Sequence, residues 1–180
     1  TNDAPSAITR LVDMDVQPYQ ISSSVLAVLA QRLVRRLCEV CKEPYQPSAQ
    51  DLMELDIDTA TAKEKLAELK RVAATTVIGR DSVSTLPPPV GNDDDITFFH
   101  PAGCEACSNT GYRGRIGIFE LMLIDEPVRR EILNNSDAKT IQRVAQQQGM
   151  RLLREDGARQ VLAGVTSVEE VLAATQAAEV

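Results

Sequence analysis

Apolar and polar positions follow a helical spacing through much of the chain, starting close to its first residue. Asp3 is a typical N-terminal cap, and Pro5 fits the first turn of a helix. A helix beginning here places Ile8 and Leu11 on one face. Pro18 then interrupts the pattern. The sequence therefore predicts a short amphipathic helix before residue 18.

The apolar stretch from Val25 to Leu37 fits two interpretations. Leu26 and Leu29 belong to a set that recurs with helical spacing, and the serines at 22–24 supply caps, so the pattern favours a helix. The second half, Gln31 to Cys38, fits a strand equally well, because periodicity does not separate short apolar segments. Both interpretations stay open on the pattern alone.

The middle of the chain predicts two helices, a loop and a short strand. Residues 48–55 and 61–74 have helical patterns, the second with a capping box from Thr61 and Glu64. Residues 80–96 combine a run of prolines with Gly-Asn-Asp-Asp-Asp, which is typical of an exposed loop. A calcium site in that loop is an alternative, although the spacing is not that of a known calcium loop. A strand is expected at Thr97–Phe99.

The last third predicts one strand followed by helices. Arg115 to Leu123 is rich in Ile, Phe and Leu and is expected to be a strand. Asp125 caps the first helix after it, and Gly149 and Gly164 are expected to end two later helices. A further capping box precedes a helix at Val168–Ala177. The whole pattern indicates an α+β fold.

Composition and charge exclude several classes of protein. The 180 residues carry a net charge of −7, and residues 48–99 hold most of the imbalance, with ten acidic and five basic side chains. A net acidic chain argues against non-specific nucleic-acid binding, which depends on Lys and Arg. No apolar run approaches the roughly 18 residues of a membrane helix, so no direct membrane span is expected. The chain opens on Thr rather than Met, and we expect it to be a piece of a longer protein.

The four cysteines carry the strongest chemical signal. They form two pairs, Cys38 with Cys41 and Cys104 with Cys107, and each pair is separated by two residues. This spacing lets both thiolates of a pair bind one tetrahedral metal ion, and two pairs complete a four-sulfur site. The 62 residues between the pairs are many, but loop closure costs grow slowly with length. Structural zinc is the preferred interpretation.

Other uses of these cysteines remain open. Two disulfides need an oxidising compartment, which nothing else in the sequence indicates. A redox-active pair is a further alternative, although one active site needs only one pair. The lone His100 lies four residues before Cys104 and is interpreted as an ordinary histidine, since four sulfurs already fill a site.

Motifs for catalysis are missing from the sequence. No G-x-x-x-x-G-K-[ST] occurs, so there is no phosphate-binding loop, and one histidine is too few for the usual histidine-based sites. These residues alone should not be an enzyme.

Five arginines flank the cysteine pairs and are expected to share one neighbourhood, either as a solvated face or as a contact for an anion: Arg32, Arg35, Arg36, Arg113 and Arg115.

Several segments resemble one family, the type II secretion and type IV pilus assembly ATPases, and match its C-terminal part. They are Thr1–Ala7, Thr9–Met14, Gln31–Cys38, Cys104–Glu120, Asp156–Gly157 and Gly164–Leu172. The run Leu11–Ser24 resembles the secretion branch more than the pilus branch. The family consists of hexameric, cytoplasmic motors that are driven by ATP and Mg²⁺ and bind an inner-membrane platform. By this resemblance the chain begins just after the family's histidine box.

The resemblance implies an organisation and a set of site residues. Residues 1–37 correspond to the end of a RecA-like ATPase domain, residues 38–114 to a four-cysteine zinc subdomain with a short antiparallel strand pair, and residues 115–180 to a strand with a helical extension. Gln31–Cys38 is then a strand paired with Arg115–Leu123. The resemblance also carries Cys38, Cys41, Cys104 and Cys107 onto the metal, and it places Arg115 near the nucleotide.

Two departures from the family and two rival functions complete the sequence interpretation. Asp15 stands where a glycine is usual, so the turn is expected to follow a different backbone path. Residues 48–96 are longer than expected and are interpreted as an acidic insertion, for which a partner contact is a hypothesis. The rivals to a motor region are a free-standing zinc interaction module and a zinc-ribbon nucleic-acid binder, and the acidic charge weighs against the second.

Overall fold

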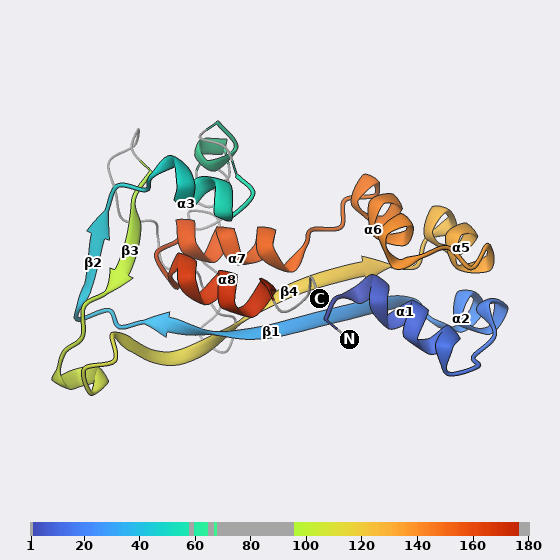
Figure 1. Ribbon diagram of the computed structural model, residues 1–180, viewed down its shortest axis with the longest axis horizontal. Coiled ribbons are helices and arrows are strands. Elements are labelled where there is room, and N and C mark those ends of the chain that lie inside the picture. The colour runs from blue at the N-terminus through green and yellow to red at the C-terminus, as the bar shows by residue number, and fades with distance from the viewer. Residues whose placement is uncertain (1, 58–59, 65–66, 68–95, 177–180) are drawn as a thin grey trace, which may run out of the picture.

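The fold is built on one long antiparallel ribbon of two strands that runs along most of the molecule (Figure 1). The computed structural model describes residues 2–57, 60–64, 67 and 96–176. Strand β1 (Ala27–Leu37) pairs with strand β4 (Tyr112–Leu123), from Ala27 opposite Leu123 to Leu37 opposite Tyr112. A second, smaller pair stands at one end of this ribbon.

The remaining elements group at the two ends of the ribbon (Figure 1). Near Ala27 and Leu123 lie α1 (Ala4–Asp13), α2 (Pro18–Ser24), α5 (Glu126–Leu133) and α6 (Ala138–Gln147). Toward the other end lie α3 (Ala49–Glu54), α7 (Leu153–Leu162), α8 (Val168–Gln176), the single turn η1 (Glu105–Cys107), and the strands β2 (Lys42–Tyr45) and β3 (Phe98–Pro101). We call these the helix end and the cysteine end. The α+β class is confirmed.

Local sequence chemistry fixes most helix boundaries as expected. The carboxylate of Asp3 accepts the N–H of Ser6 at 2.7 Å, and Asp125 caps α5 in the same way. Gly149 and Gly164 both have positive φ after their helices, at 95° and 67°. Asp15 also has a positive φ of 65°, so the expectation of a different path at this turn was wrong. Aspartate tolerates the left-handed region better than most residues.

The helical interpretation of Val25–Leu37 was wrong, and the strand interpretation is confirmed for its second half. Ala27–Leu37 is a strand throughout, and Pro18 opens α2 rather than ending a helix. The serines at 22–24 close α2 and do not cap a helix after it. Leu29 on the outer face and Val34 on the inner face are both apolar, so the strand lacks the alternation that would identify it.

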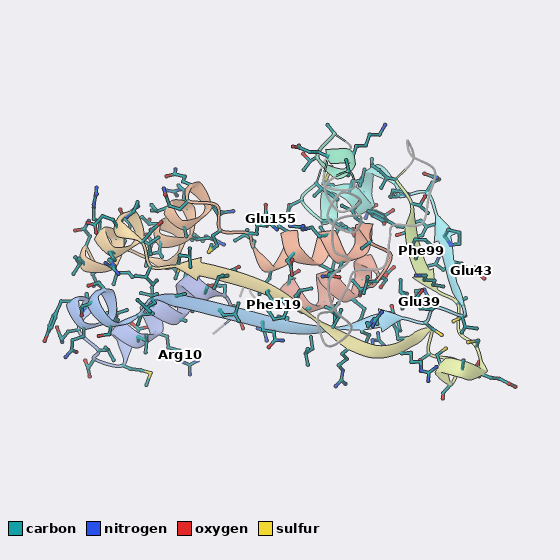
Figure 2. All side chains as sticks on the ribbon, turned by 180° about the vertical axis from the view of Figure 1, so that it is seen from behind. Arg10, Glu39, Glu43, Phe99, Phe119 and Glu155 are labelled. Carbon is teal, nitrogen blue, oxygen red and sulfur yellow. The ribbon has the colours of Figure 1, made fainter. Side chains whose placement is uncertain are left out.

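Two faces of the ribbon differ sharply in exposure. The inner face carries Val34, Ile118 and Met122, which are buried against the helices. The outer face is apolar and exposed, with exposed fractions from 43% to 60% for the following side chains: Leu29, Leu33, Phe119, Leu121 and Leu123. Figure 2 shows Phe119 partway along this ribbon. The cores therefore form on one side of the ribbon.

Each end has its own hydrophobic core. At the helix end, α1, α2, α5 and α6 enclose a cluster that includes Ile8, Val128 and Ile132. At the cysteine end, α3, α7 and α8 pack around Phe98 and Val161. Glu120 links the two groups, because its carboxylate oxygens accept the N–H of Ala4 at 2.8 Å and of Leu153 at 3.2 Å. These N–H groups open α1 and α7.

The described residues cover only part of the expected middle region. The predicted helix at 48–55 is confirmed as α3, and residues 60–64 are helical as expected for 61–74. Most of residues 65–74 and nearly all of the predicted loop at 80–96, with its alternative calcium site, lie outside the described residues. None of the described helices is long and apolar enough to cross a membrane.

Candidate metal centre

The first cysteine pair sits on a turn between β1 and β2. Leu37 ends β1, and the N–H groups of Cys41 and Lys42 both donate to the carbonyl of Cys38, at 3.2 and 3.0 Å. The N–H of Cys38 itself donates to the carbonyl of Gly111, at 2.9 Å, in the second cysteine loop. Strand β1 therefore places the first cysteine pair next to the loop that carries the second pair.

The second pair sits on η1 between β3 and β4. Ser108 and Asn109 follow it in the left-handed region, and the N–H of Asn109 returns to the carbonyl of Cys104 at 2.8 Å. Gly111 also has a positive φ of 74°, and a Cβ there would lie 2.2 Å from Pro101. Glycine is required at this position because no side chain fits between the loop and β3.

Backbone amides point at one of the cysteine sulfurs. The N–H groups of Cys104 and Gly111 both donate to the Sγ of Cys107, each at 3.2 Å. Such donors disperse the negative charge of a thiolate. The second loop is therefore shaped to hold at least one thiolate.

The four sulfur atoms form one compact group. The Sγ of Cys38 lies 4.0 Å from that of Cys104, and the Sγ of Cys107 lies 3.8 Å from those of Cys41 and Cys104. All four lie within 4.8 Å of one another. Sulfurs at about 2.3 Å from a tetrahedral zinc ion are separated by about 3.8 Å. The donor set and its spacing therefore fit a tetrahedral ion such as zinc.

The surroundings shift the acidity of two thiols in opposite directions. Desolvation raises the pKa of Cys41 to about 12, although the backbone of Gly103 counteracts it. Desolvation alone would also raise the pKa of Cys107, but the N–H groups of Cys104 and Gly111 lower it to about 6. The second cysteine loop therefore favours the thiolate form of Cys107, and a bound cation would offset the mutual repulsion of four thiolates.

The two-disulfide interpretation finds no support in this structure, and the redox interpretation stays a prediction. All four are free cysteines in the structure. His100 lies on β3 outside the four-sulfur group, with its Nε2 3.5 Å from a carboxylate oxygen of Glu43 and its ring edge-on to Tyr45. His100 thus has an ordinary environment, as the sequence led us to expect.

The flanking arginines are divided between protein partners and solvent. Arg35 donates from Nε to the carboxylate of Glu170 at 2.9 Å, and Arg32 donates to the side-chain oxygen of Asn2 at 2.8 Å. Arg115 is exposed on β4, opposite Arg35 in the register. The shared neighbourhood of all five guanidinium groups stays a prediction, although Arg35 and Arg115 do lie opposite each other. A nucleotide contact of Arg115 stays a prediction.

Two features near the centre were missed from the sequence. Strand β2 contains Pro44, which argues against a strand unless it lies at an edge, and β2 is indeed an edge strand. The polar contacts between Arg35 and residues 166–170 join segments more than 130 positions apart, and no local pattern indicates them. Figure 2 shows Glu39, Glu43 and Phe99 gathered at this end, with the sulfur atoms nearby.

Comparison with known proteins gives consistent matches over nearly the whole chain. A family model described as Type II/IV secretion system protein matches residues 1–173. The chain is 41% identical over 176 residues to a protein named Type II secretion system protein E from Pseudomonas aeruginosa, covering 98% of this chain and 28% of that protein. It is 37% identical over 175 residues to a Type IV pilus assembly ATPase PilB from Thermus thermophilus, covering 97% of this chain and 16% of that protein.

The relatives that match this chain are much longer than the chain itself. A Type IV pilus assembly ATPase TfpB from Acinetobacter baylyi is 38% identical, with 96% of this chain and 24% of that protein covered. The chain thus spans between 16% and 28% of the length of these relatives, and names from both the secretion and the pilus branches occur among them. Because the family model covers residues 1–173, this chain belongs to the family of type II/IV secretion system proteins.

Proposed function

We propose that the chain is the C-terminal metal-binding region of a motor ATPase that powers type II protein secretion. Two cysteine pairs that are 62 residues apart meet in a group whose members all lie within 4.8 Å, and this observation carries the proposal. Cys38, Cys41, Cys104 and Cys107 would hold a structural Zn²⁺, which supplies a crosslink rather than reaction chemistry. The site would then tie the end of β1 to the start of β4.

The proposal extends to the whole protein through the family. The relatives named as ATPases support ATP and Mg²⁺ use by the longer protein, with hydrolysis outside these residues. We propose a homohexamer in the cytoplasm, peripheral to the inner membrane and attached to the secretion platform, with no nucleic-acid partner. In this division residues 1–37 are the end of a RecA-like domain, residues 38–114 the metal subdomain with its acidic insertion at 48–96, and residues 115–180 a strand with a helical extension.

The secretion branch is favoured over the pilus branch by the highest identity among the relatives described above, 41% to a secretion protein. A nucleotide contact of Arg115 belongs to the same proposal. It is testable in the longer protein, where Arg115→Ala should weaken nucleotide binding at unchanged zinc content. Arg130→Ala is the control, since Arg130 is 68% exposed on α5 and is not one of the arginines that flank the cysteine pairs.

Zinc content tests the centre directly. Protein purified under reducing conditions should contain one zinc ion per chain, and a chelator should release the zinc and expose four reactive thiols. The double variant Cys41→Ser with Cys107→Ser should lose the zinc, whereas Ser108→Gly, a neighbour that keeps its left-handed backbone, should retain it. A folded protein with four free thiols and no metal under these conditions would overturn the proposal.

A further inference from the structure

The segment that leads into the last described helix is anchored on residues that flank both cysteine pairs. The backbone N–H of Leu37 donates to the carbonyl of Val165 at 2.9 Å, and the next N–H, of Cys38, donates to Gly111 at 2.9 Å. Leu37 therefore contacts the segment before α8, and the next residue, Cys38, contacts the second cysteine loop. Figure 1 shows α8 lying along the ribbon on this side.

Arg35 makes the most contacts with this segment. Its N–H and its Nε donate to the two carboxylate oxygens of Glu170, each at 2.9 Å, and its carbonyl accepts the hydroxyl of Thr166 at 2.8 Å. Its guanidinium lies 4.1 Å from the centre of the Tyr112 ring. The hydroxyl of Tyr112 in turn lies 2.9 Å from that of Ser167. Strand β1, strand β4 and α8 are thereby joined through one side chain.

Lys42, the residue after Cys41, holds the start of the same segment. Its Nζ donates to the carbonyl of Gly164 at 3.1 Å and lies 2.7 Å from a carboxylate oxygen of Glu39, between the first two cysteines. Its side chain is only 10% exposed and lies against the ring of Phe99. A movement of the first cysteine loop therefore moves Lys42, whose Nζ donates to the carbonyl of Gly164.

Residues 165–167 are buried, whereas the side chain of Arg35 is 52% exposed and that of Glu170 is 15% exposed. Thr166 and Ser167 are 0% and 1% exposed, and Val165 is 1% exposed. Buried hydroxyls such as those of Thr166 and Ser167 are costly to leave without a partner, so these contacts favour the attached state of the segment. We call this set of contacts the latch. Its members are Arg35, Leu37, Lys42 and Tyr112 on the strand side, and Gly164, Val165, Thr166, Ser167 and Glu170 on the helix side.

We propose that metal binding at the four-cysteine centre and docking of α8 are thermodynamically coupled through the latch. The inference rests on the proposed zinc site. Zinc would fix both cysteine loops, and with them Lys42 and Tyr112, so that the latch closes on α8. Coupling between two sites is reciprocal, so a closed latch must strengthen zinc binding by the same factor as zinc stabilises the docked helix.

Hydrogen exchange and zinc affinity measured on the full chain test both directions. Removing zinc with a chelator should speed amide exchange in Val168–Gln176 about tenfold, a factor within the usual range for coupled sites. Glu170→Gln removes the charge facing Arg35 and should weaken zinc binding about tenfold, as measured by competition with a chromophoric chelator. Glu169→Gln is the matched control, because Glu169 is an exposed neighbour, and it should stay within about twofold of the parent.

A conservative variant tests the coupling with little risk of misfolding. Tyr112→Phe removes only the hydroxyl next to Ser167 and should weaken zinc binding by a smaller factor than Glu170→Gln, with unchanged exchange in α5. Full zinc binding by the parent, with α8 exchange indifferent to chelation or with zinc affinity indifferent to Glu170→Gln, would overturn the coupling and leave the zinc site intact. A parent chain that binds no zinc would overturn both proposals.

Discussion

The two ends of the β1–β4 ribbon are stabilised by different means. At the helix end, α1, α2, α5 and α6 come from segments adjacent to the ribbon in sequence, and they bury a cluster around Ile8, Val128 and Ile132. At the cysteine end, β2 and β3 have four residues each and form an isolated pair. Two-stranded sheets are marginal on their own. The difference teaches that the helix end joins segments as distant as Ile8 and Val128 by apolar packing alone, whereas the cysteine end adds a four-cysteine group to its core around Phe98 and Val161.

The largest effect is expected from removing one cysteine. Cys38→Ser should abolish zinc binding and open the cysteine end, because structural zinc contributes folding free energy on the order of 10 kcal/mol in zinc-finger peptides. Hydrogen exchange should accelerate in β2 and β3 and remain slow in α5 and α6. Glu105→Gln, an exposed change between the other two cysteines, serves as control. Equal acceleration at both ends would contradict the division.

A core truncation at the helix end should have a smaller effect that spreads over that end only. Ile132→Ala removes a side chain that is 1% exposed and should lower the free energy of unfolding by about 2–5 kcal/mol. Zinc content should be unchanged. The neighbouring Leu133→Ala is the control, since Leu133 is 53% exposed, and should cost far less in a denaturant titration. Loss of zinc from Ile132→Ala would show that the two ends fold as one unit.

A close helix contact at the cysteine end gives a third, more modest test. A Cβ on Gly157 of α7 would lie 2.5 Å from a methyl carbon of Val171 on α8. Gly157→Ala should cost about 1 kcal/mol, because overpacking of about 1–3 kcal/mol is partly offset by alanine's better helix propensity. Adding Val171→Ala should recover part of that loss. If the double variant is as unstable as the sum of both changes, the two helices do not meet as described.

The smallest effect concerns pH, and its sign differs between two carboxylates. Desolvation raises the pKa of Glu120, against its bonds to Ala4 and Leu153, so its contribution is fully present below the ordinary pKa and is lost as pH rises through the folded value. Desolvation alone would raise the pKa of Glu170, but the hydrogen bonds from Arg35 outweigh it and lower the pKa. Its contribution is present above the ordinary pKa and is lost as pH falls through the folded value.

Acidification should therefore loosen α8 while it relieves the desolvation cost of the buried Glu120 carboxylate. The measurement is the free energy of unfolding and the exchange of α8 from acidic to neutral pH for the parent, Glu120→Gln and Glu170→Gln. The advantage of the parent over Glu170→Gln should shrink toward low pH, and its advantage over Glu120→Gln should shrink toward high pH. Parallel curves for both variants would refute the opposite signs.

The sequence predicted local features well and long-range ones poorly, for physical reasons. Asp125 and Gly164 act through neighbours a few residues away, so their roles as a cap and a stop could be read directly. Strand β1 was ambiguous because Leu29 and Val34 are apolar on opposite faces, and only the family resemblance indicated its pairing with β4. The cysteine spacing predicted the meeting of two distant segments because four thiols have one common chemistry.

The contacts of the latch could not be predicted from the sequence. Arg35 was recognised as one of several flanking arginines, and nothing near it in the sequence indicates that Glu170 is its partner. Burial of Thr166 and Glu120 was equally hidden, since polar residues are assigned to the surface unless tertiary contacts are known. Only the three-dimensional register of β1 against β4 and α8 brings these groups together.

The exposed outer face of the ribbon has a consequence for the colloidal behaviour of the chain. Five large apolar side chains on that face attract one another at short range between molecules, while a net charge of −7 repels at longer range. Salt at about 0.1 M shortens the reach of the repulsion to about 10 Å and leaves the apolar attraction intact. Solutions of this chain should therefore be most monodisperse at low ionic strength and should begin to cluster as salt is added.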